Sequence, residues 1–100
     1  MIAMSLTEMN LADLILLEQF RVDRLRNFFA ESLLKCIIYV DHHNLLTIHC
    51  PDPWIVDTLL TDIEDLCDHA WLILGVEAIS LFLAKEEIFH VGHCRFDQIS

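Results

Sequence analysis

The chain has 100 residues, 55% of them hydrophobic, and its 16 acidic and 6 basic side chains give a formal net charge of −10. A chain of this length forms one small domain with a single core. Because proteins hold DNA and RNA largely through Lys and Arg contacts to phosphate, so acidic a chain is a poor candidate for direct nucleic-acid binding, and its expected partners are proteins.

Two further features bear on where the protein works. The start of the chain lacks the basic region and cleavage site of a signal peptide, and the longest apolar run, residues 70–84, is too short and too interrupted to span a bilayer. The cysteines show no C-x-x-C spacing, so buried free thiols in a reducing compartment are the default interpretation; they are Cys36, Cys50, Cys67 and Cys94. We therefore expect a cytoplasmic protein.

Residues 5–34 are expected to be helical. Ser5 and Glu8 have the spacing of a capping box, and apolar residues then recur at steps of three and four from Leu11 to Leu33. The segment is either one bent helix or two short ones. We favour two, joined near residues 20–23, although no Gly or Pro marks a join.

The next two segments predict an antiparallel hairpin. Cys36 to Val40 is rich in β-prone residues, and residues 45–49 return after the turn residues Asp41, His42, His43 and Asn44. Both histidines of the turn are expected to face solvent.

A sharp corner follows the hairpin. Pro51 ends the strand, Asp52 can cap a helix, and Pro53 suits the first helical position, so Trp54 falls on the opening turn. Apolar residues spaced as one helical face predict a single long helix that ends at Gly75. Trp71 lies beside this stripe and is expected to be buried or half-buried. The opposite face is acidic and carries Asp57, Asp62, Glu64, Asp65 and Asp68.

Residues 76–83 read as a third strand, and the remaining tail is less regular, with at most an extra helical turn over residues 86–91. The expected order is helix, helix, strand, strand, helix, strand. Because a three-stranded sheet must cover its apolar face with helices, this order predicts a small two-layer α+β domain over residues 1–84 with a tail over residues 85–100.

The join from Asn44 to Asp57 and this element order resemble the N-terminal domain of the bacterial replication initiator DnaA, a KH-like fold with an Ala-Pro-Asn-x-Phe corner after a similar strand. The fold is also similar to that of DciA, a protein linked to the replicative helicase. The match covers about half of the chain, residues 35–84. It implies a non-enzymatic interaction module, without a cofactor, that docks the replicative helicase or replication regulators and can self-associate.

The resemblance also implies site residues. Trp54 takes the place of the family's helicase-contacting aromatic residue, next to Pro53 and Asp52, and a second contact patch falls near residues 24–33, with Phe28 and Glu31 as candidate members. The chain has no P-loop and no basic helix-turn-helix, so it would be a free-standing docking module and not an initiator. The acidic balance argues against the DNA binding described for DciA-type proteins.

Several features have simpler interpretations. Trp54 could be a lid on the hairpin, and the basic group Arg21, Arg24 and Arg26 could pair internally with Asp23, Glu18 or the acidic helix instead of contacting phosphate or an acidic partner. The surplus of apolar residues also fits an alternative function, a homodimeric structural or regulatory domain without a replication role.

Metal and catalytic sites have weak support. His90, His93 and Cys94 have zinc-like spacing, with Cys67 or His69 as a fourth ligand, but the paired knuckle of structural zinc sites is missing, so an ordinary packed tail is favoured. The carboxylates of residues 62–68 lie on an expected solvated helix face, and no nucleophile elbow or phosphate-binding loop is present. We therefore expect no enzyme activity.

Overall fold

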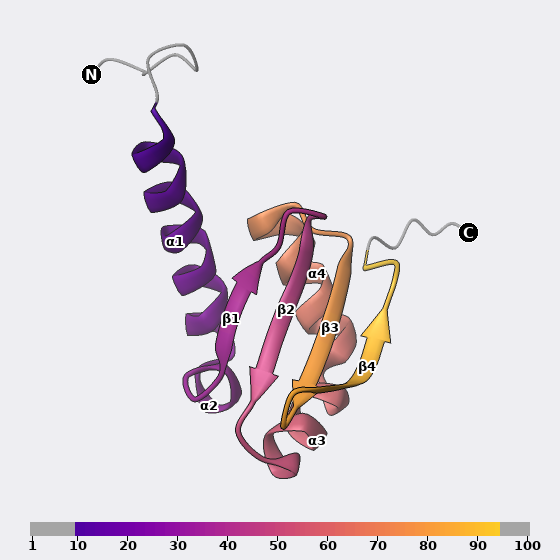
Figure 1. The fold of residues 1–100 in the computed structure, drawn as a ribbon. Helices are drawn as coiled ribbons and strands as arrows, with labels where there is room; N and C mark the ends of the chain where they lie inside the picture. The colour runs from indigo at the N-terminus through magenta and orange to yellow at the C-terminus, as the bar shows by residue number, and fades with distance from the viewer. Residues whose placement is uncertain (1–9, 95–100) are drawn as a thin grey trace.

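The computed structural model describes residues 10–94, which form four helices and a four-stranded sheet (Figure 1). In chain order the elements are α1 (Leu11–Phe28), α2 (Ala30–Leu33), β1 (Ile37–Val40), β2 (Leu45–Cys50), α3 (Pro53–Thr61), α4 (Ile63–Leu74), β3 (Ala78–Leu83) and β4 (Glu86–Val91).

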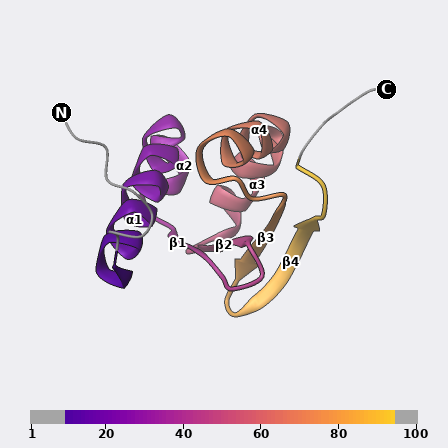
Figure 2. The same ribbon diagram turned by 90° about the horizontal axis from the view of Figure 1, so that it is seen from above.

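The sheet is mixed, with the strand order β1-β2-β3-β4. Strands β1 and β2 form the predicted antiparallel hairpin, and β3 pairs with β2 in parallel. The parallel pairing follows from the crossover through α3 and α4, since two adjacent parallel strands need a long connection. All four helices lie on one side of the sheet (Figure 2). The α+β class and the packing of helices on a sheet are confirmed, whereas the prediction of three strands is wrong.

The fourth strand takes the place of the expected helical turn over residues 86–91. It pairs antiparallel with β3 through a turn in which Ala84 and Lys85 have φ angles of 53° and 73°. Two-residue hairpin turns with positive φ angles usually contain Asn-Gly, which adopts these angles easily. Ala84-Lys85 is not such a sequence, so the turn was not predicted. The register also shifts between Leu81 and Phe82, which leaves Ile88 unpaired as a bulge and breaks the alternation of apolar and polar residues in β4.

Helix α1 is longer than expected and ends later. It runs through the predicted join at residues 20–23 and ends at Phe28; the N–H of the next residue, Phe29, donates to the carbonyl of Arg26 (3.1 Å). The described start has a capping box between Asn10 and Asp13. The Ser5–Glu8 capping box that the sequence suggests lies outside the described residues.

The single long helix expected after the corner is two helices. Asp62 separates them with φ −108° and ψ 26°. The hydroxyls of Thr58 and Thr61 donate to the carbonyls of Trp54 and Asp57, four residues back. Such bonds compete with the helical ladder and bend helices, which accounts for the break. Gly75 ends α4 in the left-handed conformation (φ 73°), as predicted.

One hydrophobic core lies between the helices and the sheet. Strands β2 and β3 supply its fully buried centre, which consists of Leu46, Ile48, Ile79 and Leu81, and α1 contributes only Val22 and Leu25. The N-terminal half of α1 extends past the sheet (Figure 1) and exposes Leu11, Leu14, Ile15, Leu16 and Phe20. Within residues 10–94, no helix has both the length and the apolar character needed to cross a membrane.

Candidate docking site

Trp54 stands out from the surface at the corner between β2 and α3. The carboxylate of Asp52 accepts a hydrogen bond from the N–H of Ile55 (3.1 Å), and Pro53 fills the first helical position. These two residues fix where the helix begins and how it is turned. The inward face of α3 is taken by Ile55, so the Trp54 ring points away from the core and is 72% exposed.

The high exposure of Trp54 bears on one of the alternatives. A lid over the hairpin would bury most of the indole ring, so that interpretation of Trp54 is wrong. Trp71, by contrast, is half-buried on α4, as expected. The two tryptophans therefore differ in role, and only Trp54 offers a large aromatic surface at a helix start.

A shallow groove lies between α2 and α3, and its lining begins on α3 one helical turn after Trp54. Its lining includes Phe28 and Glu31 on one side and Thr58 and Asp62 on the other. Thr58 lies one helical turn after Trp54 and donates its hydroxyl to the Trp54 carbonyl (3.0 Å). Helices α2 and α3 are neighbours at the same end of the sheet (Figure 1). The structure thus places the candidate residues from the α1–α2 region next to the helix that carries Trp54.

The groove wall at the end of α1 is aromatic, and its rings pack against His69 of α4. Phe28 is 55% exposed, and its ring contacts the imidazole of His69 at a centroid distance of 4.6 Å. The ring of Phe29 contacts the same imidazole edge-on, at a centroid distance of 5.3 Å. The Nδ1–H of His69 donates to the carbonyl of Asp65 (2.8 Å), which holds the imidazole on α4. Phe28 therefore offers an aromatic surface whose position is fixed.

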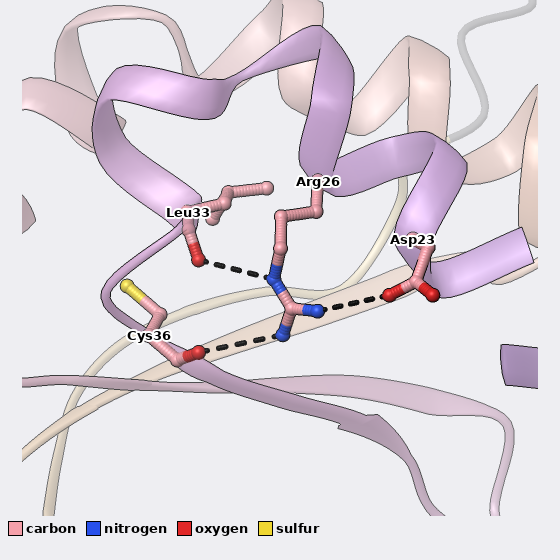
Figure 3. A network of polar contacts seen from close by, with 4 residues as sticks. All are labelled: Asp23, Arg26, Leu33 and Cys36. Atoms are coloured by element: carbon pink, nitrogen blue, oxygen red, sulfur yellow. Dashed lines mark hydrogen bonds and ion pairs between the residues drawn. The ribbon is translucent and has the colours of Figure 1, made fainter.

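Arg26 holds α2 in place (Figure 3). Its guanidinium donates to the carbonyls of Leu33 (3.3 Å) and Cys36 (3.4 Å) and pairs with the carboxylate of Asp23 (3.1 Å). This arrangement confirms internal pairing for one of the three arginines. Within residues 10–94, Arg21 and Arg24 are exposed and form no ion pair. Arg26 thus acts as a structural link between α1, α2 and β1.

The surroundings of the groove are acidic. Asp57 is exposed one turn after Trp54, and Asp62 and Glu31 line the groove itself. The acidic face continues along α4 with exposed Glu64, Asp65 and Asp68. An aromatic surface surrounded by carboxylates suits a partner that carries apolar side chains flanked by Lys or Arg.

The histidines and the cysteine of the tail do not come together. Cys94 contacts Cys67 on α4, whereas His90 binds Ser80 through Nδ1 (2.8 Å), and His69 belongs to the Phe28 cluster. In the part of the chain that the structure describes, no group of three His, Cys, Asp or Glu side chains is placed to hold a metal ion. His42 and His43 are exposed in the hairpin turn, as predicted.

One polar cluster was missed by the sequence analysis because it depends on β4. The Ser80 hydroxyl donates to the carboxylate of Glu87 (2.6 Å) and accepts from Nδ1–H of His90 (2.8 Å). Ser80 is 1% exposed, and its single proton is directed at the carboxylate. These two bonds join β3 to β4 at a buried position, so the cluster links the two strands.

Comparison of the chain with protein-family models, curated proteins and solved structures gave no match.

Proposed function

We propose that this chain is a non-enzymatic protein-docking domain whose docking site consists of Trp54 and the groove between α2 and α3. One observation carries the proposal: a tryptophan at a helix start is 72% exposed, one helical turn before the part of α3 that lines a groove with Phe28 and Glu31. Tryptophan is among the residues that most often dominate binding energy, with losses of about 2 kcal/mol or more on truncation.

The rigidity of the site supports the same proposal. The backbone of Trp54 is held by the Asp52 cap before it and by Thr58 after it. Arg26 fixes α2, the opposite wall of the groove. Binding to a surface that is already ordered loses little conformational entropy, so more of the contact energy appears as affinity.

The partner that we propose is the replicative helicase or a regulator of replication. This part of the proposal depends on the resemblance of the 44–57 corner to the initiator's N-terminal domain. Exposed carboxylates surround the groove at Glu31, Asp57 and Asp62. We therefore expect the partner's contact surface to be basic around an apolar centre.

A second candidate function is a homodimeric structural or regulatory domain with no role in replication. The observation in its favour is the exposed apolar surface of α1, which includes Leu11 (72% exposed) and Phe20 (63%). A large contiguous apolar patch on a protein surface often marks an interaction site. In this case the partner would be a second copy, and the groove beside Trp54 would stay free.

Amide chemical shifts of the labelled chain, titrated with purified replicative helicase of the source organism, distinguish the two candidates. The docking proposal predicts shifts that cluster at residues 28–32 and 52–62 and leave the first half of α1 unchanged. Shifts confined to α1 that depend on the concentration of the chain alone would favour the dimer and overturn the docking proposal.

A further inference from the structure

The four cysteines lie in two facing pairs, one at the hairpin and one at α4. Cys36 directly precedes β1 and Cys50 is the last residue of β2, so the register Ile37↔His49 places them opposite each other. The thiol of Cys94, after β4, donates to the sulfur of Cys67 on α4 at 2.7 Å. All four residues are buried, as predicted. No cysteine is left without a cysteine neighbour.

The backbone pattern of the hairpin suits a bond between Cys36 and Cys50. The N–H of Asp41 donates to the carbonyl of Leu45, so this opposed pair is hydrogen-bonded. Hydrogen-bonded and non-hydrogen-bonded pairs alternate along an antiparallel ladder, which makes Cys36 and Cys50 a non-hydrogen-bonded pair with Cα atoms about 4.5 Å apart. That separation lies within the range that a disulfide bridges, roughly 4.4–6.8 Å.

The second pair joins elements that are distant in sequence. Cys94 is held over α4 by its own backbone, because its N–H donates to the carbonyl of Glu77 (2.6 Å). Its side chain is 0% exposed, and that of Cys67 is 1% exposed. The sulfur atoms are therefore kept together by the fold and shielded from thiols of other molecules, so that an oxidant must be small and must enter during local opening of the chain.

Each pair contains one thiol that ionises more readily than its neighbour. The hydrogen bond from Cys94 lowers the pKa of Cys67, although burial and the nearby carboxylates of Asp68 and Glu64 oppose this effect. The same hydrogen bond and burial raise the pKa of Cys94. In the hairpin pair, the thiol of Cys36 donates to the carbonyl of Ser32 (3.3 Å), and the nearby Cys36 side chain lowers the pKa of Cys50, although burial opposes this effect. A thiolate next to a protonated thiol is the arrangement in which one sulfur attacks an oxidant and the other resolves the product.

We propose that the two cysteine pairs are oxidation sites at which a peroxide converts each dithiol into an intrachain disulfide, Cys67–Cys94 and Cys36–Cys50. In the first step the sulfur of Cys67 attacks one oxygen of hydrogen peroxide, the O–O bond breaks, and a sulfenic acid and one water form. In the second step the sulfur of Cys94 attacks the Cys67 sulfur, the S–O bond breaks, and the oxygen leaves as a second water with the Cys94 proton. Cys50 and Cys36 react in the same order.

Oxidation would tie the least buried strand to the helical layer. Most side chains of β4 are exposed, and its inward contacts come from Phe89 and Val91. A Cys67–Cys94 bond closes the chain from α4 to the end of β4, and so it limits opening of this strand. The groove beside Trp54 has no cysteine in its lining, so the oxidation state and docking are separate properties.

The test is peptide mapping of the reduced full-length protein after treatment with hydrogen peroxide, without a reducing agent. We expect a monomer that has lost two hydrogen atoms for each disulfide, with peptides joined as Cys67–Cys94 and Cys36–Cys50. Cys94→Ser should abolish the first linkage and keep the second, and Cys50→Ser should do the reverse. Because the wild-type map needs no variant, a folding defect in either serine variant leaves the test intact.

Three outcomes would overturn the proposal. These are disulfides between other cysteines, bonds between chains as the main product, and thiols that stay reduced or proceed only to sulfinic and sulfonic acids in the folded protein.

Discussion

Replacing Arg26 with methionine should destabilise the domain by about 2 kcal/mol. The ion pair with Asp23 is partly solvated, with side chains 24% and 64% exposed, and we assign it about 0.5 kcal/mol or less. The two carbonyl bonds, at 3.3 and 3.4 Å, are long, so each is given about 1 kcal/mol, below the usual range for a charged donor. Methionine keeps much of the aliphatic packing, so the loss reports mainly these polar contacts.

Urea unfolding followed by circular dichroism measures this loss. With a slope of about 1–1.5 kcal/mol per molar for a domain of this size, the midpoint should fall by about 1 to 2 M. Arg24→Met is the matched control, because Arg24 is exposed on the same helix and forms no ion pair within residues 10–94, and it should change the stability by about 0.5 kcal/mol or less. Equal stabilities of the two variants would refute the structural role of Arg26.

Three further predictions concern turns and caps. Replacing Ala84-Lys85 with Asn-Gly should raise the melting temperature by several degrees, since it removes the strain of two positive φ angles, worth about 1 kcal/mol; an unchanged or lower value in a thermal melt would contradict the turn. Gly75→Ala should cost about 1 kcal/mol in a urea titration although its Cβ meets no atom within 4 Å, because φ is 73°; Gly92→Ala is the control. The pKa of Asp41 is lowered by the backbone N–H of Leu45 and then by that of His43, so its carboxylate stabilises the turn above its ordinary pKa of 3.8, and that stability is lost as pH falls through the lower folded value. Asp41→Asn should therefore reduce the acid sensitivity of unfolding, and an identical pH profile would argue against this cap.

Much of the fold could be predicted from local signals. The hairpin, the corner at Pro51 to Pro53 and the helix end at Gly75 each have a residue type whose backbone preference fixes the structure. The missed elements lack such residues. Strand β4 follows a turn made by Ala84 and Lys85, which have no particular preference for positive φ, and the bulge at Ile88 hides its alternation.

The candidate site divides in the same way. The sequence places Trp54 at a helix start, but it does not reveal that Phe28 and Glu31 line a groove beside α3. That arrangement depends on the break at Phe29 and on the side chain of Arg26, which reaches carbonyls seven and ten residues away. The sequence analysis brought Cys67 and Cys94 together only as part of a weak zinc candidate, and their pairing without the histidines depends on β4, which it did not predict.

The most direct test of the docking site is the affinity of purified replicative helicase for the wild-type chain and for Trp54→Ala, measured by titration calorimetry. Leu72→Ala is the matched control, because Leu72 is 78% exposed on the last turn of α4, away from the groove. We predict that Trp54→Ala weakens binding at least tenfold, about 1.4 kcal/mol, with unchanged unfolding, while Leu72→Ala binds like the wild type. Equal affinities for all three chains, or no binding by the wild type, would contradict the account.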